Sequence, residues 1–219
     1  MRERILEAIE REKIVGIIRG VAPNVIIKLS QALYDGGLRI IEVTFDQARP
    51  ERHDDTVRAI RELRDYWKGQ MYIGAGTVTS TALVEKASAA GAQFIVSPDT
   101  NEAVIRDTLA HGMVSIPGCL TPSEMTKAHS AGADFVKLFP AANLGSAFVK
   151  AIRSPLNHLH ILAVGGINEK NMAEYLEAGC CGVGIGGNLC NRDWIASGQF
   201  ERIRDVAAQL CAIVGRLHQ

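Results

Sequence analysis

The stretch Asp134-Phe135-Val136-Lys137-Leu138-Phe139-Pro140 has the pattern of a short buried β-strand. Apolar residues lie on both sides of its centre, and Pro140 ends it because proline cannot donate to a ladder of backbone hydrogen bonds. A single lysine, Lys137, stands in the middle. Burial disfavours the ammonium form, lowers the pKa from about 10.4 and leaves a neutral amine that can attack carbonyl carbons. The stretch therefore predicts either a reactive lysine or one whose charge reaches solvent or a carboxylate.

Similar apolar stretches recur along the chain, and each is followed by a pattern typical of an amphipathic helix. Parallel strands need such crossover connections, so the alternation predicts a parallel sheet. Eight strand–helix units in one chain of 219 residues favour a single-domain (β/α)₈ barrel over residues 1–219, preceded by an extra N-terminal helix. An open, doubly wound sheet is the competing arrangement. The predicted strands begin near residues 14, 38, 71, 93, 113, 134, 160 and 182.

Composition excludes several classes of partner. The formal net charge is zero and no basic cluster occurs, which argues against nucleic acid and against an anionic membrane surface. The five cysteines are odd in number, two of them are adjacent (Cys180-Cys181), and no C-x-x-C pair occurs, as expected for a reducing compartment. The sequence shows no signal peptide and no long apolar run. We therefore expect a soluble, cytoplasmic protein.

Charged residues stand near the ends of otherwise apolar strands: Arg19, Glu42 and Lys137. In a (β/α)₈ barrel the reactive groups gather at the C-terminal ends of the strands. Alternate residues of a strand share a face, so an inward Lys137 would be accompanied by Phe135 and Phe139. The pattern predicts a carboxylate and an amine facing each other across the barrel mouth. A purely structural buried ion pair is the alternative.

Glycines follow the last two predicted strands: Gly165-Gly166 after the seventh, and Gly186-Gly187 with Asn188 after the eighth. Glycine lets backbone N–H groups converge on an anion, and these two loops are the usual phosphate site of this fold. Tight turns between strand and helix also need glycine, so either pair alone is weak support. Together they predict a phosphate-binding site.

Two other motifs are not expected to function. Gly182-x-Gly184-x-x-Gly187 matches the dinucleotide fingerprint, but it lies on the last strand and no βαβ unit follows it. His158-x-His160 has the spacing of metal ligands, but it precedes the seventh strand, at the end opposite the predicted site. We expect no cofactor and no metal ion.

Several segments resemble, in order and spacing, the 2-keto-3-deoxy-6-phosphogluconate (KDPG) aldolases and the related galactonate-type and 4-hydroxy-2-oxoglutarate enzymes. The resemblance covers nearly the whole chain. It implies a class I aldolase, a homotrimeric barrel that splits a sugar acid phosphate into pyruvate and glyceraldehyde 3-phosphate. The segments are Glu42-Val43-Thr44, Gly74-Ala75-Gly76-Thr77-Val78, Phe94-Ile95-Val96-Ser97-Pro98, Pro117-Gly118, Lys137-Leu138-Phe139-Pro140, Gly165-Gly166-Ile167 and Gly186-Gly187.

The same resemblance implies roles for single residues. Lys137 matches the Schiff-base lysine and Glu42 the acid/base carboxylate. Thr77 matches a contact to the pyruvate carboxylate, and Pro98 and Phe139 line the pocket. The two glycine loops match the phosphate site.

The chain departs from the gluconate-type pattern at a few positions. Asp46 replaces an arginine that many of these enzymes carry four residues after the catalytic glutamate, which assigns carboxylate binding to Arg19. The surroundings of Arg19 and the presence of Val164 before the first glycine pair resemble the galactonate-type enzymes. Asn188 stands where serine is more common.

Other functions remain open on the residues alone. A phosphate-binding barrel isomerase or epimerase could use Glu42 and Lys137 for proton transfer without a covalent step. A non-catalytic barrel could sense sugar acid phosphates. A metal-dependent aldolase is a lesser alternative.

Overall fold

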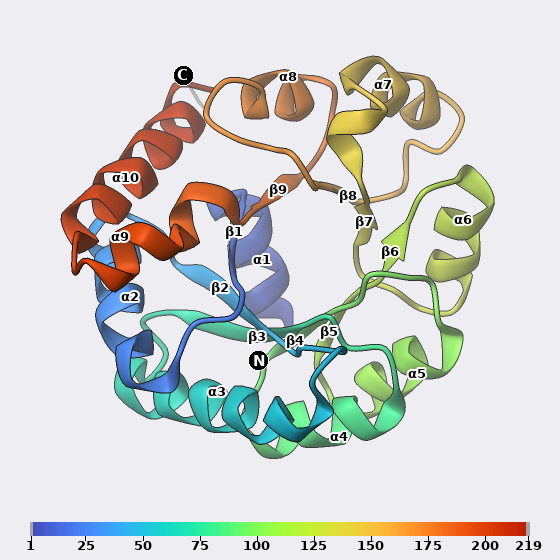
Figure 1. Cartoon of the computed structure of the whole chain (residues 1–219). Coiled ribbons are helices and arrows are strands. Elements are labelled where there is room, and N and C mark those ends of the chain that lie inside the picture. The colour runs from blue at the N-terminus through green and yellow to red at the C-terminus, as the bar shows by residue number, and fades with distance from the viewer. Residues whose placement is uncertain (1, 218–219) are drawn as a thin grey trace.

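The computed structural model describes residues 2–217, apart from the side chain of Asn188. Within this part, nine strand segments form one all-parallel sheet in the order β5-β4-β3-β2-β1-β9-β8-β7-β6. The sheet curls into a barrel, and helices surround it on the outside (Figure 1). The strands are β1 (Ile14–Ile18), β2 (Ile40–Thr44), β3 (Tyr72–Gly76), β4 (Phe94–Val96), β5 (Val114–Ile116), β6 (Gly118–Cys119), β7 (Val136–Leu138), β8 (Ile161–Val164) and β9 (Gly182–Ile185).

The predicted (β/α)₈ barrel is confirmed, and the alternative prediction of an open, doubly wound sheet is wrong. The fifth barrel strand is interrupted at Pro117, so it appears as β5 and β6. Proline lacks an N–H, and the next residue, Gly118, passes so close to Pro98 that an added Cβ would lie 2.3 Å from its carbonyl oxygen. β5 pairs with β4, and β6 pairs with β7. The Lys137 N–H donates to the Pro117 carbonyl at 2.8 Å, which helps to close the barrel.

Most predicted helices follow their strands as expected. Side-chain caps fix several starts: Ser80 for α4, Asn101 for α5, and a capping box between Thr121 and Glu124 for α6. The helices are α1 (Arg2–Glu12), α2 (Pro23–Asp35), α3 (His53–Trp67), α4 (Thr81–Ala89), α5 (Glu102–Ala110), α6 (Pro122–Ser130), α7 (Ser146–Arg153), α8 (Met172–Glu177), α9 (Arg192–Ala196) and α10 (Phe200–Leu217), with short 3₁₀ turns η1 (Pro50–Arg52), η2 (Ala141–Asn143) and η3 (Gly187–Cys190).

Two helical features differ from the expectation. α8 begins at Met172 rather than near residue 168, because the side chains of Asn168 and Asn171 accept hydrogen bonds from nearby backbone N–H groups and hold that segment in turns. α9 was not predicted at all. It is a short helix between the last strand and α10, too short to show a hydrophobic period.

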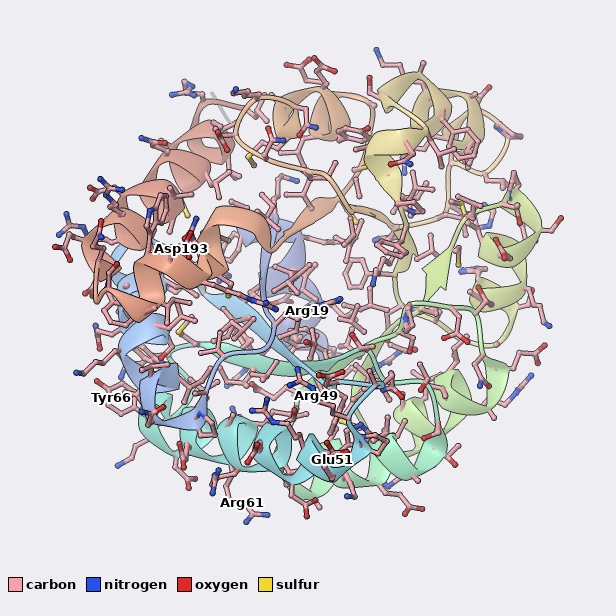
Figure 2. The ribbon with its side chains drawn as sticks, in the orientation of Figure 1. Arg19, Arg49, Glu51, Arg61, Tyr66 and Asp193 are labelled. Carbon is pink, nitrogen blue, oxygen red and sulfur yellow. The ribbon has the colours of Figure 1, made fainter. Side chains whose placement is uncertain are left out.

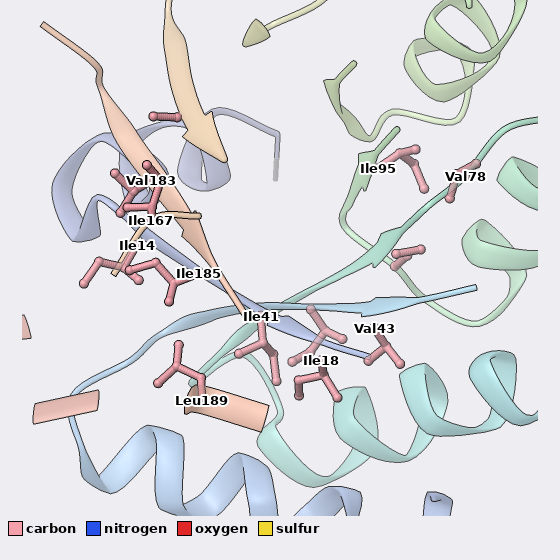
Figure 3. Packing of buried hydrophobic residues seen from close by; sticks show 14 of the residues in the cluster. Ile14, Ile18, Ile41, Val43, Val78, Ile95, Ile167, Val183, Ile185 and Leu189 are labelled. Carbon is pink, nitrogen blue, oxygen red and sulfur yellow. The ribbon is translucent and has the colours of Figure 1, made fainter. Parts of the chain in front are cut away.

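The apolar core has two parts. The larger lies between the sheet and the outer helices, and Figure 3 shows part of it, including Ile18, Ile41 and Leu189. The smaller lies inside the barrel and includes Phe94 and Phe135. The N-terminal helix α1 buries its apolar face against this second part and so covers the N-terminal end of the barrel. The opposite end is left for the site.

Among the described residues, no helix has the length and apolar content that a membrane span would need.

Candidate active site

A cavity of about 660 Å³ lies at the C-terminal ends of the strands. Within the described part of the chain it gathers the predicted site residues from strands and loops far apart in the sequence. The side chain of Asn188 is outside the described part. The predicted residues that line this reaction cavity are Arg19, Glu42, Thr77, Pro98, Lys137, Phe139, Val164, Gly165, Gly166, Gly186 and Gly187.

Lys137 lies on β7 and points into the barrel. Its side chain is buried, and the residue is 7% exposed. Nζ donates to the Ser97 carbonyl at 3.2 Å and lies 4.8 Å from the centre of the Phe139 ring. Burial lowers the pKa of Lys137, and the positive charge of Arg19 lowers it further, while the charge of Glu42 partly opposes the shift. The surroundings therefore favour the neutral, nucleophilic amine.

Glu42 lies on β2, which is four barrel positions from β7 in either direction when β5 and β6 count as one. The two side chains thus face each other across the barrel. Glu42 is 3% exposed, and burial raises its pKa to about 7, against the positive charges of Lys137 and Arg19. Its Oε2 has no hydrogen-bond partner among the described atoms. A carboxyl group with this pKa can both take and give a proton at neutral pH.

The space for Glu42 depends on a glycine of the neighbouring strand. An ideal Cβ at Gly76 would lie 2.7 Å from Glu42 Oε1 and 2.9 Å from Thr44 Cγ2. Real Cβ atoms do not approach so closely, so a larger residue at this position would displace the carboxylate. The need for glycine here comes from a close approach and not from backbone conformation.

Thr77 and Arg19 stand at the mouth of the barrel. Thr77 follows β3 in the left-handed region (φ 57°), which is uncommon for a residue with a branched side chain. Its carbonyl accepts a hydrogen bond from Gln47 Nε2 at 2.8 Å. Arg19 follows β1, is exposed and lies near the centre of the view into the barrel, whereas Arg61 and Tyr66 lie on the outer ring of helices (Figure 2).

The two glycine loops lie on the same side of the cavity, after β8 and β9. Gly165 and Gly166 both have positive φ, at 93° and 76°. An added Cβ at Gly165 would lie 3.0 Å from Phe139, and one at Gly166 would lie 2.5 Å from the Ala142 Cβ. A side chain at either position would therefore collide with its neighbours, so the close packing and the positive φ both require glycine.

Among the lining residues that sequence reasoning missed, three have charged or amide side chains: Asn168, Glu169 and Arg192. Arg192 lies on α9, the helix that was not predicted. The available signal was a basic residue shortly after the second glycine pair, as the phosphate site of this fold often involves a short extra helix.

The glycine motif at residues 182–187 and the His158-x-His160 pair lie where the sequence predicted them. Gly184 is inside β9, where an added Cβ would lie 2.8 Å from Val164, so this glycine serves packing. His160 Nδ1 lies 2.7 Å from an oxygen of Glu10 on α1, at the end of the barrel away from the reaction cavity. Within residues 2–217, no three His, Cys, Asp or Glu side chains gather in a group that could hold a metal ion.

The family model described as "Aldolase: KDPG and KHG aldolase" matches residues 5–206. The chain is 35% identical over 216 residues to the 2-dehydro-3-deoxy-phosphogluconate aldolase of Treponema pallidum (96% of this chain, 98% of the relative). It is 36% identical over 203 residues to a Rhizobium meliloti protein named "Probable 2-dehydro-3-deoxy-6-phosphogalactonate aldolase" (92% and 93%).

A solved structure is also similar. This is a KDPG aldolase from Legionella pneumophila with pyruvate captured as a covalent carbinolamine intermediate (TM-score 0.83, 26% identity, 93% of this chain and 96% of the other). These likenesses support a class I aldolase and do not favour an isomerase, an epimerase or a sensor. With the family model matching most of its length, the chain belongs to the KDPG and KHG aldolase family.

Proposed function

We propose that this carbon–carbon lyase works through a Schiff base on Lys137, with Glu42 as its acid and base. The observation that carries the proposal is the pairing itself: a buried amine with a lowered pKa and a buried carboxyl with a pKa of about 7 line one cavity from opposite strands. The covalent carbinolamine with pyruvate in the Legionella relative adds support from the family.

The chemistry follows from these two groups. Neutral Lys137 attacks the C2 ketone of the substrate, and loss of water gives an iminium ion. The iminium accepts the electron pair of the C3–C4 bond as that bond breaks, while Glu42, through a water molecule, takes the proton of the C4 hydroxyl. The aldehyde leaves and an enamine remains. The enamine is protonated at C3 by Glu42, and hydrolysis releases pyruvate and the free amine.

The ends of the substrate are held by groups around this centre. We propose that Arg19 and Thr77 bind the carboxylate, because both line the cavity at its mouth and a guanidinium can hold a carboxylate with two hydrogen bonds. Pro98 and Phe139 enclose the reacting carbons. The glycine loops at residues 165–166 and 186–187, with Asn188, bind the phosphate and fix the distal end of the substrate, which supplies orientation.

We propose that the substrate is a 2-keto-3-deoxy-6-phospho-sugar acid and that the galactonate type is preferred over the gluconate type. Val164 ends β8, beside the β7 strand of Lys137, and lines the cavity with a methyl surface where a threonine would offer a hydroxyl. Comparing kcat/KM for the two substrates tests this, and Val164→Thr should shift the ratio towards the gluconate type. A higher kcat/KM for the gluconate substrate in the unaltered protein would contradict it.

The covalent step is tested by incubating the protein with pyruvate and borohydride. Reduction should fix an adduct on Lys137, seen by peptide mass spectrometry, and Lys137→Ala should abolish both adduct and turnover. Lys127, an exposed lysine that pairs with Glu102, provides the matched control, and Lys127→Ala should keep both. Normal turnover in Lys137→Ala would refute the proposal.

Activity that survives EDTA would argue against the metal-dependent alternative.

We further propose a homotrimer in the cytoplasm. The family resemblance supports the trimer, and the five free thiols suit a reducing compartment. Sedimentation at several protein concentrations and cell fractionation test the two statements.

A further inference from the structure

A second cavity, of about 390 Å³, adjoins the reaction cavity. The two share three lining residues: Arg19, Thr77 and Arg192. Arg192 therefore stands on the wall between them. This residue has no role in the mechanism above.

The backbone of Arg192 is held in place by its neighbours. The Asn191 side chain caps α9 by accepting hydrogen bonds from the N–H groups of Asp193 and Trp194, both at 3.1 Å. Leu189, just before this cap, is completely buried, and the Arg202 guanidinium lies 5.5 Å from the Trp194 ring. The start of α9 is thus fixed directly after the second glycine loop.

The side chain of Arg192 reaches towards the loop after β1. An ideal Cβ at Gly20 would lie 3.4 Å from Arg192 Nη2. Gly20 is the residue after Arg19, so the Arg192 guanidinium lies close to the backbone next to Arg19, and both arginines line both cavities. Gly20 has φ 67°, a conformation that glycine adopts without strain.

This region carries unbalanced positive charge. In the second cavity Arg49 pairs with Asp46 at 2.7 Å, and Arg52 pairs with Asp55 at 3.2 Å. Arg19 and Arg192 take part in none of the ion pairs found among residues 2–217. The charge of Arg19 acts on the buried Glu42, whereas Arg192 has no acid paired with it in the described part of the chain, so a bound anion would balance the charge of Arg192.

Arg19 and Arg192 differ in their distance from the chemistry. The charge of Arg19 acts on both Glu42 and Lys137 and shifts their pKa values, whereas that of Arg192 contributes to neither shift. Arg192 thus acts less on the reacting pair than Arg19 does. Arg192 also follows the Gly186-Gly187 turn, where the distal end of the substrate is expected. Glu169 lines the same cavity, and its negative charge would oppose a bound phosphate unless a cation such as Arg192 offsets it.

We propose that Arg192 binds the phosphate of the substrate and determines the preference for phosphorylated over unphosphorylated sugar acids. Arg19 then remains with the carboxylate, so each end of the substrate has its own guanidinium. This inference rests on the proposed function, because it assumes a phosphorylated sugar acid attached at Lys137.

Arg192→Gln removes the charge and keeps much of the side-chain length. We expect kcat/KM for the phosphorylated sugar acid to fall about 10- to 100-fold through a rise in KM, because one charge-assisted contact is lost. The same sugar acid without its phosphate should lose less than about 2-fold, and Arg192→Lys should restore part of the preference. The matched control is Arg106→Gln, which removes an exposed arginine that pairs with Glu102 on α5.

A third measurement separates the two anionic ends. The pyruvate concentration that half-saturates borohydride trapping reports the carboxylate alone, and Arg192→Gln should leave it unchanged. A rise in that concentration would assign Arg192 to the carboxylate and overturn the inference. An equal loss on both sugar acids, or no loss on either, would overturn it as well. Failure of the unaltered protein to trap pyruvate would instead refute the proposed function.

Discussion

At the scale of single residues, the proposed mechanism depends on burial acting on two ionisable groups. Glu42 and Lys137 lie across the barrel from each other, and desolvation shifts each towards its neutral form. Burial is the largest cause of both shifts, and the positive charge of Arg19 lowers both pKa values. The pair titrates as a coupled unit, so a pH profile reports the pair.

Glu42→Gln should stabilise the protein above neutral pH. Because the folded-state pKa of Glu42 is raised from 4.5 to about 7, the folded state holds its proton longer than the unfolded state. The stability linked to that proton is complete below about pH 4.5 and is lost as the pH rises through 7, and a shift of this size corresponds to about 3 kcal/mol. Urea unfolding at pH 5 and pH 8, at one protein concentration, should show the variant gaining much more stability over the unaltered protein at pH 8 than at pH 5.

Glu42→Gln should also lower activity strongly, and the activity that remains should no longer rise with pH. The unaltered protein needs ionised Glu42 to take the C4 hydroxyl proton, so its kcat/KM should rise towards an apparent pKa near 7. Parallel stability curves at the two pH values, or an unchanged activity profile, would contradict the assignment.

Gly76→Ala should disable the site without unfolding the barrel. The new methyl group would lie 2.7 Å from Glu42 Oε1, so the carboxylate must move. A displacement of about 1 Å in a reacting group can cost about 100-fold in rate, and we expect a loss of that order in kcat with an unchanged circular dichroism spectrum. Gly215→Ala is the matched control, since Gly215 lies in α10 with nothing within 4 Å of an added Cβ, and it should keep full activity. Equal activity in both variants would show that the Glu42 carboxylate does not have to move to accommodate the added methyl group.

At the scale of elements, α1 closes one end of the barrel and leaves the other for catalysis. Its buried residues Ile5, Ala8 and Ile9 meet the barrel interior, where Phe94 and Phe135 lie. Polar contacts hold the helix in place: Arg2 pairs with Asp134, and Glu10 with His160. The helix therefore belongs to the core although it precedes the repeating units.

Ile9→Ala should lower stability but not the rate per folded molecule. Ile9 is fully buried, and replacing such a side chain with alanine costs about 2–4 kcal/mol. Glu7→Ala, on the exposed face of the same helix, should change stability by less than about 0.5 kcal/mol. Urea unfolding measures both variants. A loss of kcat at full stability would indicate instead that α1 takes part in the chemistry.

At the scale of the whole molecule, the chain closes on itself. β1 pairs with β9, and α10 packs against α2, so early and late segments hold each other. We propose that residues 1–219 form one domain, because each unit shares its core with both neighbours. Calorimetry should show one unfolding transition, with the calorimetric and van't Hoff enthalpies equal for the assembled species. Two separable transitions would contradict a single domain.

The relation between sequence and structure differs between these scales. The sequence predicted the barrel because hydrophobic periodicity is local, and it placed Lys137, Glu42 and the glycine loops at strand ends for the same reason. It missed α9, whose few residues carry no period, and with it Arg192. It also did not predict that the strand resumes after Pro117 as β6, where Gly118 passes close to Pro98.

The sequence by itself determined the alternation of strands and helices and the kinds of reactive side chain that stand where the strands end. Only the tertiary structure decided that Glu42 has a pKa near 7 and that Arg192 lines the same two cavities as Arg19. The physical reason is that a residue's place in a pattern is set by its neighbours in the chain. Its distance to a distant charge and its exposure to water are set by how the whole barrel closes.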